Sequence, residues 1–225
     1  MEKIIVANVK AALAPDQVNN WLKSFQGLYA PSASVKVVLA VPFLYMEQVA
    51  GKIAGIDQVT LAAQTVSPRP SGNYTGATPA AWLKGLADYV LVGHRERRLY
   101  YHEDNQTVAA QVRETVSAGI TPIICLDRKN KGSQLAAIDT EDLEQSLVAY
   151  TPDDSVKLEI PADNQEISDT AASFASAAGV KVLYGGGVNK GNAAELAGLA
   201  GISGLMVGKG CLDGGEFAEL VNSVR

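Results

Sequence analysis

The sequence predicts a single-domain (β/α)8 barrel over residues 1–225, and three observations lead to this fold class. Short aliphatic runs recur eight times along the chain, and segments with helical spacing of apolar residues lie between most of them. The connections between these segments are short, which favours parallel strands joined by helices. The length also suits one barrel, because such folds often reach roughly 200–250 residues as one domain.

The aliphatic runs give eight predicted strands in chain order. They cover residues 3–9, 35–41, 59–63, 89–92, 121–126, 146–150, 180–184 and 204–207. A doubly wound open sheet is the structural alternative. Such a sheet usually stops at five to seven strands and carries a glycine fingerprint after its first strand, and residues 7–10 have none.

The predicted helices follow from apolar periodicity and from residues that favour helix ends. Pro15 opens the first helix, and Gly119 and Gly179 end two later ones. We expect Trp21 and Trp82 to lie on helix faces that pack on the barrel. The predicted segments are the helix that follows Pro15, 46–53, a short helix after Thr78, 105–118, two short turns at 133–138 and 139–143, then 165–178, 192–199 and 215–224.

Composition excludes several classes of function. The net charge of −5 comes without a basic stripe, which argues against a nucleic-acid partner. No apolar stretch approaches the ~20 residues of a membrane span, so no membrane partner is expected. The start of the chain lacks a signal peptide, and the cysteines suggest a reducing compartment, so we expect a cytoplasmic protein without disulfides. Cys125 should be a buried packing thiol and Cys211 a loop residue that can be exposed. No metal site and no cofactor are predicted.

In a parallel barrel, the residues that follow the strands gather at one face, where ligands bind. Asn8 and Lys10 follow the first strand on one side of the chain, and His94 and Glu96 follow the fourth. A lysine and a histidine that converge in this way can polarise the carbonyl group of a substrate. For the charged run after His94, a solvated helix start is the simpler interpretation.

Glycine-rich turns follow the last two strands. They are Gly185-Gly186-Gly187 and Gly208-Lys209-Gly210. Bare backbone N–H groups at adjacent late strands of a barrel commonly bind phosphate, although each turn taken alone can be merely a tight turn. These residues and the Lys10–His94 pair suggest a small phosphorylated ligand.

The chain resembles the triosephosphate isomerase family from end to end. The matching segments occur in the family's order; they are 8–10, Gln64, 72–76, 92–98, 102–103, 121–125, 183–189 and 207–208. The resemblance implies a dimeric or tetrameric barrel, a homodimer first, that interconverts two triose phosphates in glycolysis and gluconeogenesis. It also implies that the Thr75 loop inserts into a neighbouring subunit.

The same resemblance implies roles for individual residues. Lys10 would stabilise the enediolate and the phosphate charge, and His94 would shuttle protons at the carbonyl as a neutral imidazole. Asn8 would help to form the oxyanion site, and Glu96 would hold Lys10. The substrate-binding residues would be Gly186, Gly187, Gly208 and Lys209.

The departures from the family pattern concern the base and the lid. The family's catalytic glutamate ends strand six, and Thr151 stands there in this chain. A hydroxyl group cannot abstract a proton near neutral pH, because its pKa is far too high. The lid that follows, residues 153–161, has no glycine and carries acidic residues. Gly187 replaces a serine that would latch a closed lid, and Lys209 replaces a glycine of the phosphate loop.

An alternative alignment keeps a base. Strand six would then be residues 155–158, preceded by a helix over 140–148, and Glu159 would be the base. Three hypotheses therefore stay open: a family member with lost or strongly reduced isomerase activity, an active isomerase that uses Glu159, Asp153 or Asp154, and a non-catalytic binding or regulatory protein.

Overall fold

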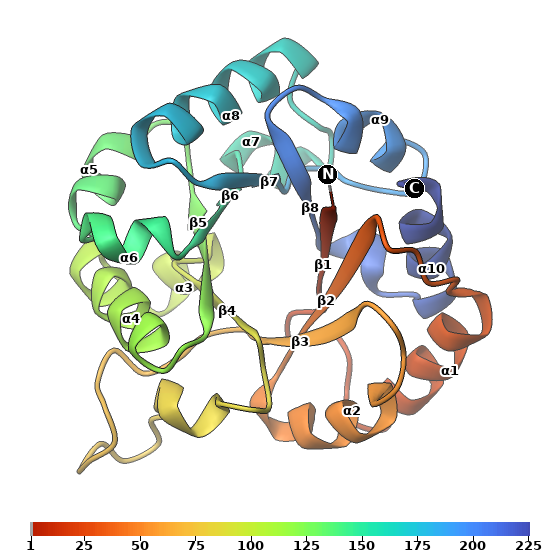
Figure 1. Cartoon of the computed structure of the whole chain (residues 1–225), viewed down its shortest axis with the longest axis horizontal. Coiled ribbons are helices and arrows are strands. Elements are labelled where there is room, and N and C mark those ends of the chain that lie inside the picture. Colours follow the sequence, from red (N-terminus) through yellow and green to blue (C-terminus); the bar gives the residue numbers. More distant parts are fainter. Residues whose placement is uncertain (1) are drawn as a thin grey trace.

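Eight parallel strands close into a barrel, with β1 paired to β8, as the sequence predicts (Figure 1). The computed structural model describes residues 2–225, apart from the side chains of residues 156 and 157. Each strand pairs with its neighbour in sequence, so the chain runs once around the barrel. The strands are β1 Lys3–Asn8, β2 Val35–Val41, β3 Val59–Ala63, β4 Tyr89–Val92, β5 Thr121–Leu126, β6 Leu147–Tyr150, β7 Lys181–Tyr184 and β8 Ile202–Val207.

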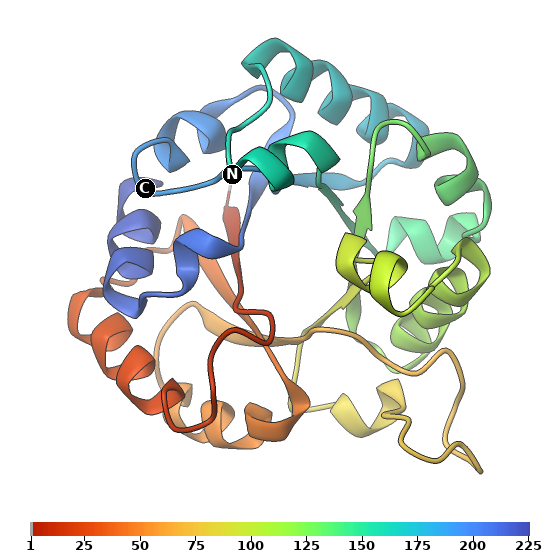
Figure 2. The ribbon, with the colours of Figure 1, turned by 180° about the vertical axis from the view of Figure 1, so that it is seen from behind.

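Helices surround the barrel, and both views show the ring that they form (Figures 1 and 2). The α-helices are α1 Val18–Leu28, α2 Met46–Ile53, α3 Arg95–Tyr100, α4 Asn105–Ser117, α5 Lys131–Ala136, α6 Thr140–Glu144, α7 Asp153–Leu158, α8 Asn164–Ala178, α9 Ala193–Gly198 and α10 Gly214–Ser223. Three short 3-10 helices are η1 Phe43–Tyr45, η2 Ala80–Leu83 and η3 Lys209–Cys211.

Local sequence explains where the long helices begin and end. The Asp163 side chain accepts from the N–H groups of Gln165 and Glu166 at the start of α8. The helix ends at Gly179, whose φ of 66° is readily adopted by glycine. On α1, the buried residues share one face, and they are Val18, Trp21, Leu22 and Phe25.

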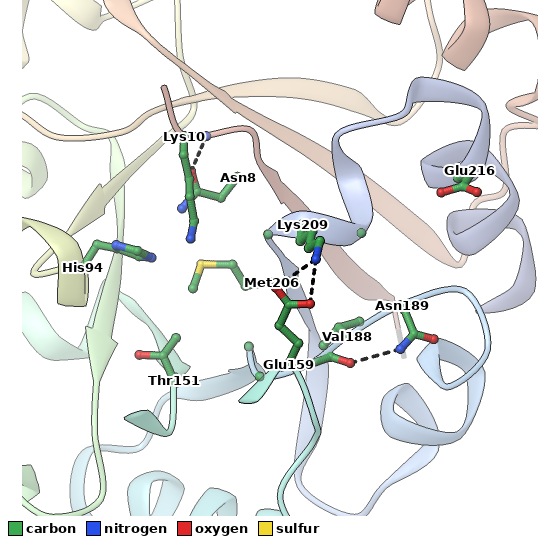
Figure 3. Close-up of a pocket in the computed structure, with 15 residues that line it drawn as sticks. Asn8, Lys10, His94, Thr151, Glu159, Val188, Asn189, Met206, Lys209 and Glu216 are labelled. Carbon is green, nitrogen blue, oxygen red and sulfur yellow. Dashed lines mark hydrogen bonds and ion pairs between the residues drawn. The ribbon is translucent and has the colours of Figure 1, made fainter. Parts of the chain in front are cut away.

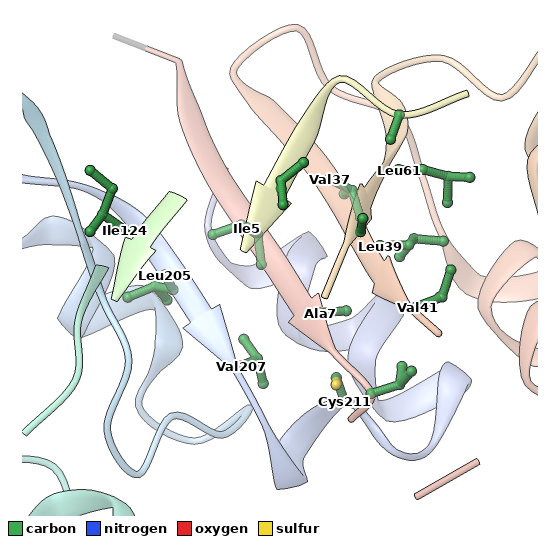
Figure 4. Packing of buried hydrophobic residues seen from close by; sticks show 14 of the residues in the cluster. Ile5, Ala7, Val37, Leu39, Val41, Leu61, Ile124, Leu205, Val207 and Cys211 are labelled. Atoms are coloured by element: carbon green, nitrogen blue, oxygen red, sulfur yellow. The ribbon is translucent and has the colours of Figure 1, made fainter. Parts of the chain in front are cut away.

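The core has two layers, as expected for strands that are covered on both faces. One cluster fills the barrel interior and includes Val6, Leu91, Cys125 and Met206. The larger cluster lies between the strands and the helices, and Figure 4 shows part of it around Ile5, Leu39 and Val207. Burial on both faces explains why the strands appear in the sequence as continuous aliphatic runs.

The predicted strands and long helices agree with the structure to within a few residues at each end. The charged run after His94 forms α3, which has no buried residue. The alternative strand at 155–158 is wrong, because these residues belong to α7. The helix proposed over 140–148 is also wrong: α6 ends at Glu144 and β6 begins at Leu147.

Two expectations about single side chains were wrong. Cys211 is fully buried, because η3 turns back against α1, where the Trp21 indole N–H donates to the Cys211 carbonyl oxygen at 2.8 Å. Trp82 is 66% exposed and does not pack on the barrel. Cys125 is buried inside the barrel as expected. Within residues 2–225, no helix is long and apolar enough to cross a membrane.

Candidate active site

A cavity of about 400 Å³ lies beyond the carboxyl ends of the strands (Figure 3). Nine of the ten predicted site residues line it: Asn8, Lys10, His94, Thr151, Glu159, Gly186, Gly187, Gly208 and Lys209. The tenth, Glu96, is not a lining residue, but its carboxylate forms an ion pair with the Lys10 ammonium group. Sequence reasoning missed Met206, Asn189 and Glu216 as lining residues. Met206 belongs to the barrel-interior cluster, so strand alternation on β8 was the signal that pointed to it.

Lys10 is held in one position by three contacts. Its ammonium group lies 2.6 Å from the Glu96 carboxylate. Its backbone N–H donates to Asn8 Oδ1 at 3.1 Å, and its carbonyl oxygen accepts from the Gln64 side chain at 3.1 Å. Lys10 also has a φ of 53°, a conformation that non-glycine residues rarely adopt and that clusters at functional sites. Asn8, Gln64 and Glu96 therefore hold Lys10 at the cavity lining.

His94 is a neutral imidazole in this site. Burial lowers its pKa from 6.5 to about 4, and the Glu96 carboxylate opposes this shift only in part. The imidazole Nδ1 accepts from the Glu96 backbone N–H at 3.3 Å at the start of α3, so the ring proton is on Nε2. The 3.7 Å approach of Nδ1 to the Glu96 carboxylate is therefore not an ion pair. His94 presents an N–H donor to the cavity.

The shifted pKa of His94 predicts a change of stability with pH. Its folded pKa of about 4 lies below its ordinary value of 6.5, so the unfolded chain binds the proton first as pH falls. Between pH 6.5 and 4, protonation of His94 in the unfolded chain should lower the free energy of unfolding by about 3 kcal/mol. Urea unfolding at several pH values checks this. Between pH 6.5 and 4, the free energy of unfolding of His94→Gln should change less with pH than that of the native chain. Substitution of the exposed His102 by Gln should leave this pH dependence unchanged. Equal pH dependence for the native chain and His94→Gln would contradict the prediction.

The two glycine turns form the part of the cavity that we call its anion end, and the turn after β8 adjoins Lys10, since a Cβ atom at Gly208 would lie 3.9 Å from the Lys10 ammonium nitrogen. Among the described residues, the N–H groups of Gly186, Gly187 and Gly208 donate to no protein acceptor. The Lys209 ammonium group lies beside them on η3 and contacts the Glu159 carboxylate at 2.8 Å. Free backbone N–H groups next to a cation form a suitable site for a small anion.

Thr151 directly follows β6, which is the position predicted for it. Its side chain is 4% exposed, and its hydroxyl group donates to the Leu126 carbonyl oxygen at 3.5 Å. Of the three carboxylates expected as possible bases, Asp153 and Asp154 do not line this cavity. Asp153 pairs with Arg95 at 2.9 Å, and both Asp153 and Asp154 line a separate cavity. Glu159 and Glu216 are the carboxylates among the lining residues of the described chain.

The fold and the site together define a class of protein. This is a (β/α)8 barrel that presents a lysine, a neutral histidine donor and an anion-binding turn around one cavity, an arrangement suited to a small anionic carbonyl compound. Comparisons with known proteins agree with this class. The family model for triosephosphate isomerase matches residues 3–224.

Several curated relatives carry the same description. The triosephosphate isomerase of Mycolicibacterium vanbaalenii is 37% identical over 213 residues, which cover 83% of this chain and 82% of that protein. Those of Orientia tsutsugamushi and Deinococcus radiodurans are each 31% identical over 100% of this chain, and cover 99% and 100% of their own lengths. The chain belongs to the triosephosphate isomerase family.

Proposed function

We propose that this chain binds a triose phosphate or a closely related small phosphorylated ligand, and that its isomerase activity is lost or strongly reduced. The observation that carries the proposal is Thr151 at the end of β6, with no free carboxylate among the described residues that line the space between Lys10 and His94. Interconversion of a ketose and an aldose requires a base that removes a proton from carbon, and a threonine hydroxyl does not do so near neutral pH.

The binding half of the site supports the first part of the proposal. Lys10 and His94 line the same cavity as the glycine turns, so a carbonyl oxygen and a phosphate group of one small molecule both have partners in it. No step of the proposed binding requires a metal ion or a cofactor.

An active isomerase that uses Glu159 is the second candidate, because Glu159 lines the same cavity. Two observations argue against it. The Glu159 carboxylate is paired with the Lys209 ammonium group at 2.8 Å, and the Glu159 side chain is 57% exposed to solvent. A non-catalytic regulatory protein that binds no sugar phosphate is the third candidate.

A coupled assay with glyceraldehyde 3-phosphate separates these functions when it is combined with thermal shift. We expect turnover at least about 10²-fold below that of an isomerase with its base, and a rise in melting temperature with millimolar glycerol 3-phosphate by ligand linkage. Robust turnover that disappears in Glu159→Gln would establish the second candidate instead. If the melting temperature does not rise at millimolar glycerol 3-phosphate, the third candidate remains, a regulatory protein that binds no sugar phosphate.

We further propose that the chain forms a homodimer through the loop between β3 and η2. This loop extends away from the barrel in both views, and η2 lies beside it (Figures 1 and 2). Large apolar side chains on it and on nearby elements are exposed: Tyr74, Trp82, Leu99, Tyr100 and Tyr101. Exposed apolar groups of this size often mark an interface. Light scattering should give twice the 23.6 kDa of one chain.

A further inference from the structure

The segment that follows α7 forms a fixed wall of the anion end of the cavity. It lies directly on Gly187, which has a φ of 59°. A Cβ atom at Gly187 would lie 2.5 Å from the carbonyl carbon of Ile160 and 2.6 Å from the nitrogen of Pro161. The segment is also held at its far end, where the Ala162 N–H donates to the Tyr184 hydroxyl at 2.8 Å. Gly187 and the Tyr184 hydroxyl group thus both contact the backbone of residues 160–162 in this structure.

Glu159 is the residue of this wall that reaches into the cavity. Its backbone is left-handed, with a φ of 57°, and its carboxylate contacts the Lys209 ammonium group at 2.8 and 3.1 Å (Figure 3). The ion pair joins the segment after α7 to the turn after β8, beside the free N–H groups of Gly186 and Gly187. Lys209, the cation beside the free glycine N–H groups, is thus already paired with a carboxylate of the same chain, that of Glu159.

This ion pair can open without unfolding the wall. The side chains of Glu159 and Lys209 are 57% and 76% exposed, and exposed pairs of this kind contribute little to stability. Rotation of the Glu159 side chain toward solvent leaves the contact of Ile160 and Pro161 with Gly187 unchanged. Only side-chain torsions separate the paired state from a state in which Lys209 is free.

We propose that Glu159 is an intramolecular competitor of the ligand's anion for Lys209, so that only an anion with further contacts in the site displaces it. An incoming monocarboxylate would offer Lys209 the same group that Glu159 already supplies at high effective concentration. A phosphate monoester carries about −1.5 to −2 charges at pH 7 and three acceptor oxygens, so it can displace Glu159 and also accept from the glycine N–H groups. This inference rests on the proposed function, namely a site for a phosphorylated ligand.

Isothermal titration with inorganic phosphate and with acetate, at pH 7.5 and constant ionic strength, tests the inference. Glu159→Gln should bind phosphate roughly fivefold more tightly than the native chain, because Lys209 is free and a like charge is gone. Acetate binding should tighten as well, because both anions compete with Glu159 for Lys209. Lys209→Gln should weaken phosphate binding by a similar factor. When Lys209 is already replaced by Gln, Glu159→Gln should increase the phosphate affinity by a smaller factor, because the two residues act through one contact.

The matched control is Glu219→Gln, which breaks another exposed ion pair, that of Lys190 and Glu219 at 2.7 Å, outside the cavity lining. Its phosphate affinity should equal that of the native chain. If the native chain binds phosphate and Glu159→Gln binds it equally or more weakly, the competitor role is wrong while the proposed function stands. If neither binds phosphate at millimolar concentration, the proposed function fails and the inference fails with it.

Discussion

Replacement of Thr151 by Glu should raise the rate of glyceraldehyde 3-phosphate isomerisation by about 10²–10⁴-fold over the native chain, the range that a positioned general base contributes. The position is suitable, because Thr151 follows β6 directly and lines the cavity that holds Lys10 and His94. Under the proposed function, Lys10 and His94 would supply the cation and the neutral N–H donor to the substrate carbonyl. A carboxylate at position 151 would then supply the base that this proposal holds to be missing.

The measurement is a coupled assay on the purified variant, with Thr151→Gln as the control of equal shape and no basicity. Phosphate affinity and the circular dichroism spectrum establish that each variant keeps its site and its fold. A folded, phosphate-binding Thr151→Glu variant that is no faster than Thr151→Gln would contradict the proposal that the missing base limits this chain. A native chain already as fast as the glutamate variant would contradict it equally.

Replacement of Gly204 by Ala should destabilise the barrel by at least about 3 kcal/mol, at the upper end of the range for overpacking in a core. Gly204 lies in β8 and pairs with Ile4 of β1, where the barrel closes. A Cβ atom there would lie 1.9 Å from the Ile4 carbonyl oxygen. This contact is with backbone that belongs to a strand ladder, so neither side can move away without loss of the pairing.

The control for Gly204 is Gly27→Ala on α1, where the same added methyl group meets nothing within 4 Å. That substitution should be neutral or stabilise the chain by about 0.5–1 kcal/mol, because alanine favours a helix over glycine. Urea unfolding followed by circular dichroism measures both variants. If the free energy of unfolding of Gly204→Ala lies within 1 kcal/mol of that of the native chain, the close approach of β1 and β8 at Gly204 is wrong.

The sequence was most informative about the strands and the binding half of the site. Aliphatic runs buried on both faces are long and regular, so β2 through β5 have the bounds that their composition predicts. Asn8 ends such a strand, Lys10 and His94 follow such strands closely, and a closed barrel necessarily brings strand ends together. The glycine turns at 185–187 and 208–210 were found for the same reason.

The segment between β6 and α8 was poorly predicted. Residues 153–158 carry no strong periodicity, and a short strand and a short helix fit them equally well by pattern. The helix α7 is favoured by tertiary contacts, above all the pair of Asp153 with Arg95 of α3 and the burial of Ser155. Neither contact is visible in a local pattern, because the partners are far apart in the sequence.

The sequence by itself therefore determined the barrel, the convergence of Lys10 and His94 on one cavity, and the position of Thr151 directly after strand six, since each depends only on residue type and position along a strand. The tertiary structure alone determined where the candidate bases Asp153 and Glu159 lie. Asp153 is paired outside the cavity, and Glu159 is inside it, bound to Lys209. The physical reason is the packing of Ile160 and Pro161 on Gly187, which fixes where Glu159 leaves the backbone and which cation it can reach.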